Sequence, residues 1–173
     1  MRHIKLILCF VIMLCVASCG KSPKISNCDL KNILGTKVIL PASINNMSDD
    51  TYKIISYIDS TECAQCVLNN LHMWKDIKEE YFYPQNIPII FIATPKFFDN
   101  NIDPIYIDYM QKSFVLIKDV DNKFRQRCHF LHNGNYRTFL LDCNDRILFV
   151  GSPIHNKKFL EGYKFAISKT ARE

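Results

Sequence analysis

The feature that most constrains this chain is a strand, a short bend and a helix that carries two cysteines. The apolar residues 54–58 predict a buried strand. The bend Asp59-Ser60-Thr61 offers side-chain oxygens that suit the start of a helix. Beyond it, apolar residues recur in steps of three and four, as on one face of an amphipathic helix: Val67, Leu71, Trp74, Ile77 and Tyr81. The C-x-x-C formed by Cys63 and Cys66 therefore falls on the first turn of that helix.

This placement of Cys63 and Cys66 favours redox chemistry. Cysteines three residues apart lie on the same side of a helix and can close a disulfide, and a helix N-terminus lowers the pKa of a thiol. Two other interpretations stay open. The pair could be a structural disulfide at the helix start, or it could bind zinc or copper together with the Cys128-His129-x-x-His132 cluster.

The first residues of the chain predict an export signal. A short basic segment, residues 1–5, precedes an apolar segment, residues 6–16, which has signal-peptide length and is too short to span a membrane. Val16-Ala17-Ser18-Cys19-Gly20 then resembles the lipobox of bacterial lipoproteins. That resemblance implies a signal peptide at residues 1–18, a lipid-modified (palmitate-bearing) Cys19 and a tether at residues 19–34. The alternative is an ordinary signal peptide that leaves Cys19 unmodified.

In both cases we expect the domain of residues 35–173 to lie outside the cytoplasm, where disulfides persist. The length of 173 residues suits one domain. Without Arg2 and Lys5 the formal charge falls from +5 to +3, which is too small and too scattered to indicate nucleic-acid binding. Removal of the signal and lipidation of Cys19 leave five cysteines, an odd number that implies at least one unpaired thiol or an intermolecular partner: Cys28, Cys63, Cys66, Cys128 and Cys143.

The remaining elements follow from hydrophobic pattern and turn residues. Residues 37–41 predict a short edge strand that ends at a proline. Residues 87–93 predict a parallel strand buried on both faces. Residues 95–113 predict helical pieces interrupted at Pro104, residues 114–117 a strand, and residues 122–131 a short helix. Residues 136–141 and 146–150 predict a β-hairpin, and a final amphipathic helix follows Pro153.

This order of elements resembles that of membrane-tethered thioredoxins of the TlpA/ResA type, known from Bacteroides-like bacteria. The resemblance covers roughly residues 35–168, and Leu116-Ile117-Lys118-Asp119 and Phe139-Leu140-Leu141-Asp142 match strands of that family. It implies an α/β, thioredoxin-like fold with a mixed central sheet flanked by helices. It also implies that Cys63 is the exposed attacking thiolate and Cys66 the more buried resolving thiol.

Two positions depart from the family pattern. The alignment places Tyr136 where the family has a cis-proline that faces the disulfide. Because a non-proline cis bond costs about 3 kcal/mol, we expect a trans peptide there. Glu62 stands where the family has an aromatic residue. A carboxylate beside Cys63 raises the thiol pKa, and Ala64-Gln65 supplies no cation, so we expect a reducing rather than an oxidising pair.

The sequence thus predicts a lipid-anchored thiol–disulfide oxidoreductase of the cell envelope, facing the periplasm, with a role in redox homeostasis. Its catalytic residues are Cys63 and Cys66, its partners are other envelope proteins, and it needs no cofactor or metal beyond the dithiol. The competing hypothesis is a non-catalytic thioredoxin-fold lipoprotein, a binding or assembly module whose C-x-x-C is structural or handles metal.

Overall fold

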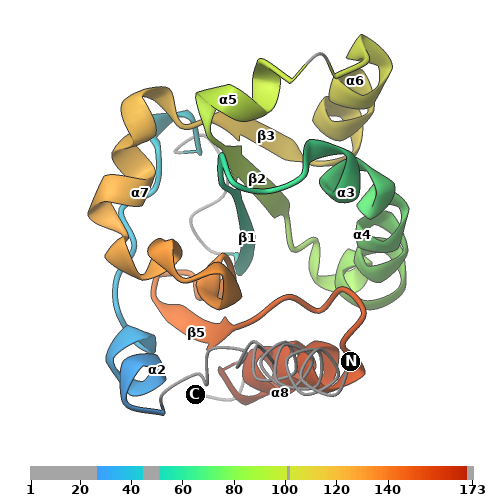
Figure 1. Ribbon diagram of the computed structural model, residues 1–173. Helices are drawn as coiled ribbons and strands as arrows, with labels where there is room; N and C mark the ends of the chain where they lie inside the picture. Colours follow the sequence, from blue (N-terminus) through green and yellow to red (C-terminus); the bar gives the residue numbers. More distant parts are fainter. Residues whose placement is uncertain (1–26, 45–50, 101, 171–173) are drawn as a thin grey trace, which may run out of the picture.

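In the computed structural model, which describes residues 27–44, 51–100 and 102–170, strand β1 (Lys53–Ile58) lies at the centre of a five-stranded sheet (Figure 1). The strand order is β3-β2-β1-β4-β5. The other strands are β2 (Ile89–Ala93), β3 (Val115–Lys118), β4 (Thr138–Leu141) and β5 (Ile147–Val150). The predicted signal peptide, Cys19 and residues 19–26 of the predicted tether lie outside the described residues.

Parallel and antiparallel pairing meet at β1. Strand β1 pairs in parallel with β2, and β2 pairs in parallel with β3. On its other side β1 pairs antiparallel with β4, which forms a hairpin with β5. All five residues of β2 are buried, as expected for an interior parallel strand. The predicted mixed sheet is confirmed.

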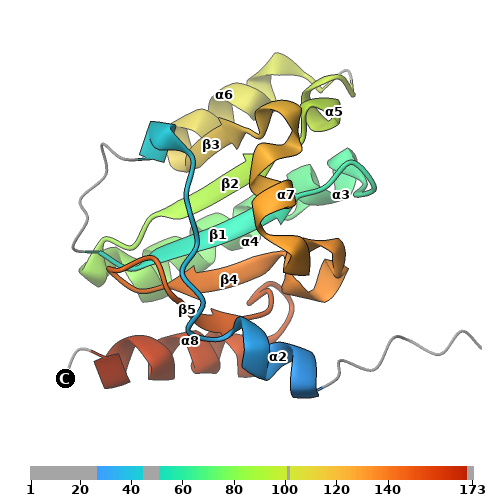
Figure 2. The same ribbon diagram turned by 90° about the vertical axis from the view of Figure 1, so that its left-hand side faces the viewer.

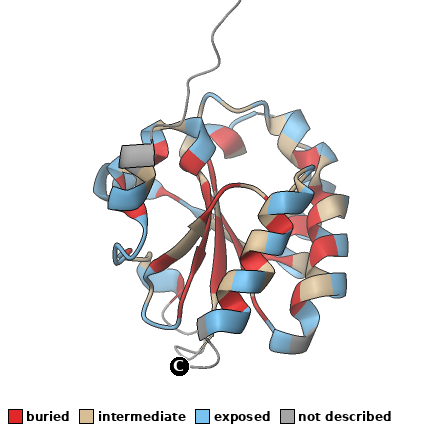
Figure 3. Cartoon of the chain, turned by 90° about the horizontal axis from the view of Figure 1, so that it is seen from below, coloured by how far each residue is buried: buried red, intermediate tan, exposed pale blue. Residues whose placement is uncertain are grey.

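One face of the sheet is covered by five helices: α3 (Ala64–Asn69), α4 (Leu71–Ile77), α5 (Pro95–Phe98), α6 (Pro104–Ser113) and α8 (Lys157–Thr170). Trp74 packs edge-on against Phe91 of β2, with ring centroids 5.7 Å apart. Figure 3 shows the buried residues along the strands and on the inner sides of the helices. Burial of these apolar surfaces, at roughly 25 cal/mol per Å², is the main force that holds the helices on the sheet.

The opposite face is covered by α2 (Asn27–Ile33), α7 (Lys123–Arg127) and the segment that follows α2. In Figure 2 this segment runs across the strands beside α7. Short 3-10 helices complete this layer at Ala42–Ile44, Val120–Asn122, His129–His132 and Gly134–Tyr136. With helices on both faces of a mixed sheet, the predicted thioredoxin-like fold is confirmed.

Three local expectations are corrected. Residues 37–41 do not form a strand, because only Lys37 makes a bridge, to Arg146. Residues 27–33, expected as the end of the tether, form α2, whose Ile33 is buried. The predicted helix at residues 122–131 ends as an α-helix at Arg127 and continues after Cys128 as a 3-10 turn.

The helix that follows the cysteines is also less regular than its pattern predicts. It breaks at Asn70 between α3 and α4, and it continues as a π-helix at Lys78–Phe82 and a 3-10 turn at Tyr83–Gln85. The apolar face is kept, with Leu71, Trp74 and Ile77 buried. None of the helices in the described ranges is long and apolar enough to cross a bilayer.

Candidate redox site

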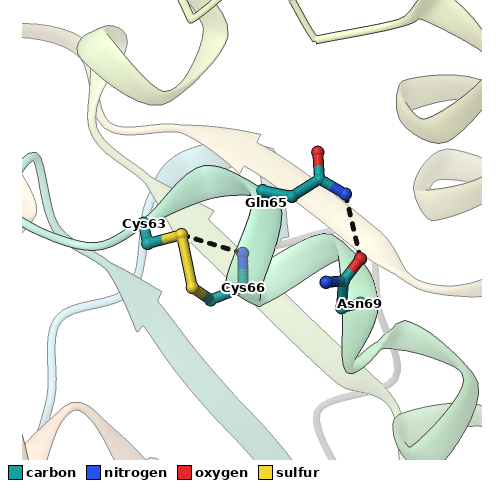
Figure 4. The surroundings of a disulfide bond; sticks show 4 residues. All are labelled: Cys63, Gln65, Cys66 and Asn69. Carbon is teal, nitrogen blue, oxygen red and sulfur yellow. Dashed lines mark hydrogen bonds between the residues drawn. A yellow bond between two sulfur atoms is a disulfide. The ribbon is translucent and has the colours of Figure 1, made fainter.

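Cys63 and Cys66 form a disulfide at the start of α3, with their Cα atoms 5.2 Å apart (Figure 4). Cys63 is the N-cap residue of α3, in an extended backbone conformation. Its Sγ accepts a hydrogen bond from the N–H of Cys66 at 3.1 Å. The bend Asp59-Ser60-Thr61, from which we expected the helix cap, does not supply it. The sulfur takes that place because the helix begins one residue after Cys63.

Both cysteines are exposed. The expectation that Cys66 is the more buried of the two stays a prediction, because both belong to the exposed class. What distinguishes them is the hydrogen bond, because only the Cys63 sulfur accepts an N–H at the helix start. A hydrogen bond of this kind favours the charged form of the acceptor, so it points to Cys63 as the sulfur better able to carry a thiolate.

Asp59 organises the loop that precedes the disulfide. Its carboxylate is buried, at 2% exposure, and accepts the N–H of Ser60 at 2.7 Å and the Thr61 hydroxyl at 3.1 Å. Arg125 and Arg137 pair with its two oxygens at 3.0 and 2.6 Å. Burial by itself raises the pKa of Asp59, but these hydrogen bonds and the two guanidinium groups outweigh it and lower the pKa below its ordinary value.

Arg137 joins this loop to the start of β4. Besides Asp59, its guanidinium donates to Glu62 at 2.8 Å and to the carbonyl of Leu131 at 3.3 Å. Its own carbonyl accepts the N–H of Tyr57 at 2.8 Å. Our sequence reasoning missed Arg137. The available signal was an arginine directly before a fully buried strand, since a charge in that position requires a partner.

A second buried carboxylate fixes the neighbouring strand ends. Asp119, which follows β3, accepts the hydroxyl of Tyr57 at 3.1 Å and the N–H of Phe124 at 2.8 Å. It thereby holds the end of β1 and the start of α7 together. Burial, the charge of Asp119 and this hydrogen bond raise the pKa of Tyr57, so the phenol stays protonated at neutral pH.

A cleft of about 440 Å³ lies beside the loop that carries the disulfide. Its lining includes Glu62, Val67, Asn70, Arg137 and His155. His155 Nε2 lies 3.2 Å from Asn70 Oδ1, so these two lining side chains are in contact. The cleft shares lining residues with a larger, mainly apolar cavity of about 590 Å³: Gly134, Thr138, Ser152, Ile154 and His155.

Tyr136 stands at the position where the sequence resemblance implies a cis-proline. No peptide bond between described residues is cis, so the expected trans peptide at Tyr136 is confirmed. The Tyr136 ring is buried in the core below the site, and its hydroxyl has no hydrogen-bond partner among the described residues. The chain therefore presents no proline surface to the disulfide at this position.

The metal-binding alternative finds no support in the described part of the chain. There, no three His, Cys, Asp or Glu side chains gather closely enough to hold a metal ion. Cys128 is buried in the core, away from solvent, whereas His129 and His132 are exposed. Burial, together with the charge of Asp119 and against that of Arg127, raises the pKa of Cys128 to about 11, which keeps it a thiol at neutral pH. Cys128 and the exposed Cys143 are both unpaired.

Comparisons with known proteins found distantly similar solved structures. No protein-family model matches the chain, and no curated protein has a matching sequence. A solved structure assigned as a thioredoxin from Neisseria meningitidis is 20% identical, with a TM-score of 0.48 over 74% of this chain and 83% of that one. A protein assigned as the thiol:disulfide interchange protein DsbE from Chlorobium tepidum is 12% identical, with a TM-score of 0.48 over 77% of this chain and 94% of that one.

The thioredoxin domain of a thiol-disulfide oxidoreductase from Bacteroides vulgatus is 11% identical, with a TM-score of 0.43 over 69% of this chain and 81% of that one. At such identities and TM-scores these similarities carry no argument about activity. The assignment of the fold rests on the strand order, the pairing directions and the helices on both faces of the sheet. The chain thus has a thioredoxin-like fold in which a disulfide-bonded C-x-x-C opens the helix after the central strand.

Proposed function

We propose that this protein is a thiol–disulfide oxidoreductase of the cell envelope, anchored to the membrane through lipid on Cys19 and facing the periplasm. The observation that carries the proposal is the exposed Cys63–Cys66 disulfide at the start of α3. An exposed disulfide can be reached by the thiolate or disulfide of another protein, which exchange requires. Other envelope proteins are the proposed partners.

The reaction needs only the two cysteines. In the reduced protein, the Cys63 thiolate attacks one sulfur of a substrate disulfide, the substrate S–S bond breaks, and a substrate thiolate leaves. The Cys66 thiolate then attacks Cys63 Sγ, which releases the second substrate thiolate. The substrate gains two electrons and the protein returns to the disulfide observed here.

The hydrogen bond from the Cys66 N–H supports Cys63 as the attacking sulfur. It remains available when the disulfide opens, because the donor belongs to the backbone of α3. Stabilisation of the thiolate raises the fraction of Cys63 that is reactive at neutral pH.

A purely structural role accounts less well for the pair. In the chain-entropy model, the stabilisation from a disulfide grows with the length of the loop that it closes. Cys63 and Cys66 are three residues apart, so the loop is near the shortest possible and the gain is about 2 kcal/mol. Exposure also leaves the bond open to reductants, which suits exchange better than a permanent cross-link.

Disulfide reduction with insulin as substrate and dithiothreitol as electron donor tests the activity. The wild-type domain should accelerate insulin precipitation, and Cys63→Ser should fall to the uncatalysed rate. Cys143→Ser, which removes an exposed cysteine outside the pair, is the matched control and should keep full activity. If Cys63→Ser keeps both the fold and the activity, the oxidoreductase assignment is wrong and the binding-module hypothesis takes its place.

The anchor is tested separately from the chemistry. Cells fed a clickable palmitate analogue should label the wild-type protein in the membrane fraction. Cys19→Ala should abolish the label and release the protein from membranes. Label retained in that variant would contradict lipidation at Cys19.

A further inference from the structure

The carboxylate next to the proposed nucleophile is not alone. Glu62 directly precedes Cys63, so their Cα atoms are about 3.8 Å apart. Glu62 Oε1 lies 2.8 Å from Arg137 Nη1. Arg137 comes from the start of β4, 75 residues further along the chain. Ala64-Gln65 supplies no cation, as the sequence shows, but Arg137 supplies one to Glu62 from a distant part of the chain.

Arg137 is held in a fixed position by several groups. Its Nη2 donates to Asp59 Oδ2 at 2.6 Å, and its Nε donates to the Leu131 carbonyl at 3.3 Å. The Arg137 side chain is 14% exposed and the Asp59 side chain 1%. Because its planar guanidinium is bound at three nitrogens, Arg137 cannot turn away from Glu62 without losing bonds to buried partners.

The charges around the loop balance. Asp59 and Glu62 supply two negative charges, and Arg125 and Arg137 supply two positive charges. Two histidines lie next to these charges. His132 Nδ1 lies 3.3 Å from Arg125 Nη2. His155 lines the same cleft as Glu62 and Arg137. Reduction of the disulfide places a further negative charge on Cys63, so the balance between Glu62 and Arg137 bears directly on that thiolate.

We propose that Arg137 is a positioning residue of the exchange site, which pairs with Glu62 and offsets the charge that opposes the Cys63 thiolate. The inference rests on the proposed function, because it matters only if Cys63 and Cys66 exchange electrons with a partner. Glu62 and Arg137 then set the reduction potential of the pair in opposite directions. Glu62 disfavours the thiolate of the reduced protein, and Arg137 restores it.

Opposite shifts are the signature that separates this role from general damage to the fold. Glu62→Gln removes a negative charge beside Cys63, so it should stabilise the reduced form and raise the reduction potential. Arg137→Ala leaves Glu62 unpaired, so it should stabilise the disulfide and lower the potential. Because the Glu62 side chain is 31% exposed, Glu62→Gln tests the inference even if Arg137→Ala unfolds. Arg137→Lys should restore part of the loss, since it keeps the charge but not the fork of nitrogens.

The experiment equilibrates each variant in dithiothreitol buffers, quenches with acid, alkylates the thiols, and measures Cys63 and Cys66 by mass spectrometry. We expect the equilibrium constant for reduction to change about threefold in each direction, as for a partly exposed ion pair. That change is about 15 mV, since a tenfold change corresponds to about 30 mV. Lys75→Ala and Glu79→Gln make the same charge changes in an exposed pair between α4 and the π-helix that follows it, and they should leave the potential unchanged.

The pH dependence of Cys63 alkylation gives a second readout. Its midpoint should fall in Glu62→Gln and rise in Arg137→Ala, because the first change removes a negative charge beside the Cys63 thiolate and the second removes the positive charge that offsets it.

The outcomes distinguish the inference from the function on which it rests. The wild-type pair could exchange normally while the reduction potentials of both variants stay unchanged or shift in the same direction. That result overturns the role of Arg137 alone. A wild-type pair that stays oxidised in every buffer overturns the proposed function and this inference with it. Opposite shifts in Glu62→Gln and Arg137→Ala, absent from the Lys75 and Glu79 controls, support both.

Discussion

At the scale of the residue, Asp59 is the charge on which the geometry of the redox loop depends. It is a buried carboxylate with two guanidinium partners, a serine N–H and a threonine hydroxyl. Removal of one member of such a buried group leaves the others desolvated and unpaired, which costs more than the group contributes when complete. The loop before Cys63 is therefore rigid because of a set of charges, and not because of apolar packing.

Asp59→Asn should destabilise the domain by about 3 kcal/mol at pH 7, because Arg125 and Arg137 then face a neutral amide. Urea unfolding followed by tryptophan fluorescence of Trp74 measures the change. The matched control is Asp76→Asn, an exposed position on α4, which should stay within about 0.5 kcal/mol of the wild type.

The same variant carries a pH signature. The pKa of Asp59 is lowered in the folded state, so its contribution is present above the pKa of the unfolded chain, near 3.8, and is lost as the pH falls through the lower folded value. Wild-type stability should therefore decline below about pH 4 more steeply than that of Asp59→Asn. Equal slopes for the two proteins in acid would contradict an ionised, paired Asp59.

At the scale of the element, the sequence was informative wherever the cause was local. The apolar run of β2, the hairpin turn at Asp142 and the amphipathic pattern of α8 were all found in place. Asp142 shows why: its Oδ1 accepts the N–H groups of Asn144 and Arg146, so the turn is specified by residues two and four positions away.

The elements that the sequence predicted wrongly depend on contacts with residues far along the chain. Residues 37–41 carry an apolar run typical of a strand, yet they make only the isolated bridge of Lys37 with Arg146, beside a hydrogen bond from the Val38 N–H to the Asp145 carbonyl. The partners, Asp145 and Arg146, lie in the turn before β5 and far along the chain, so the segment itself does not encode how far it pairs. The helix likewise breaks at Asn70 although no proline or glycine stands there to predict a break. The Asn70 side chain hydrogen-bonds to the distant His155.

At the scale of the whole molecule, the two cysteines were predictable and their surroundings were not. A C-x-x-C after a strand is visible in ten residues, whereas the pairs of Arg137 with Asp59 and Glu62 join residues 78 and 75 positions apart. Only the antiparallel pairing of β4 with β1 brings these charges together. The expectation that Glu62 raises the pKa of Cys63 did not consider Arg137 for that reason.

The measurement that tests the central claim most directly is the redox titration of the wild-type disulfide. The folded domain from Asn27 onward is equilibrated in dithiothreitol buffers and alkylated, and each cysteine is mapped by mass spectrometry. If the account is right, Cys63 and Cys66 titrate together near the potential of thioredoxin, roughly −270 mV, and Cys63 is alkylated first. A pair that remains oxidised far below that potential would contradict it, because such a disulfide is a structural cross-link and the protein a binding module.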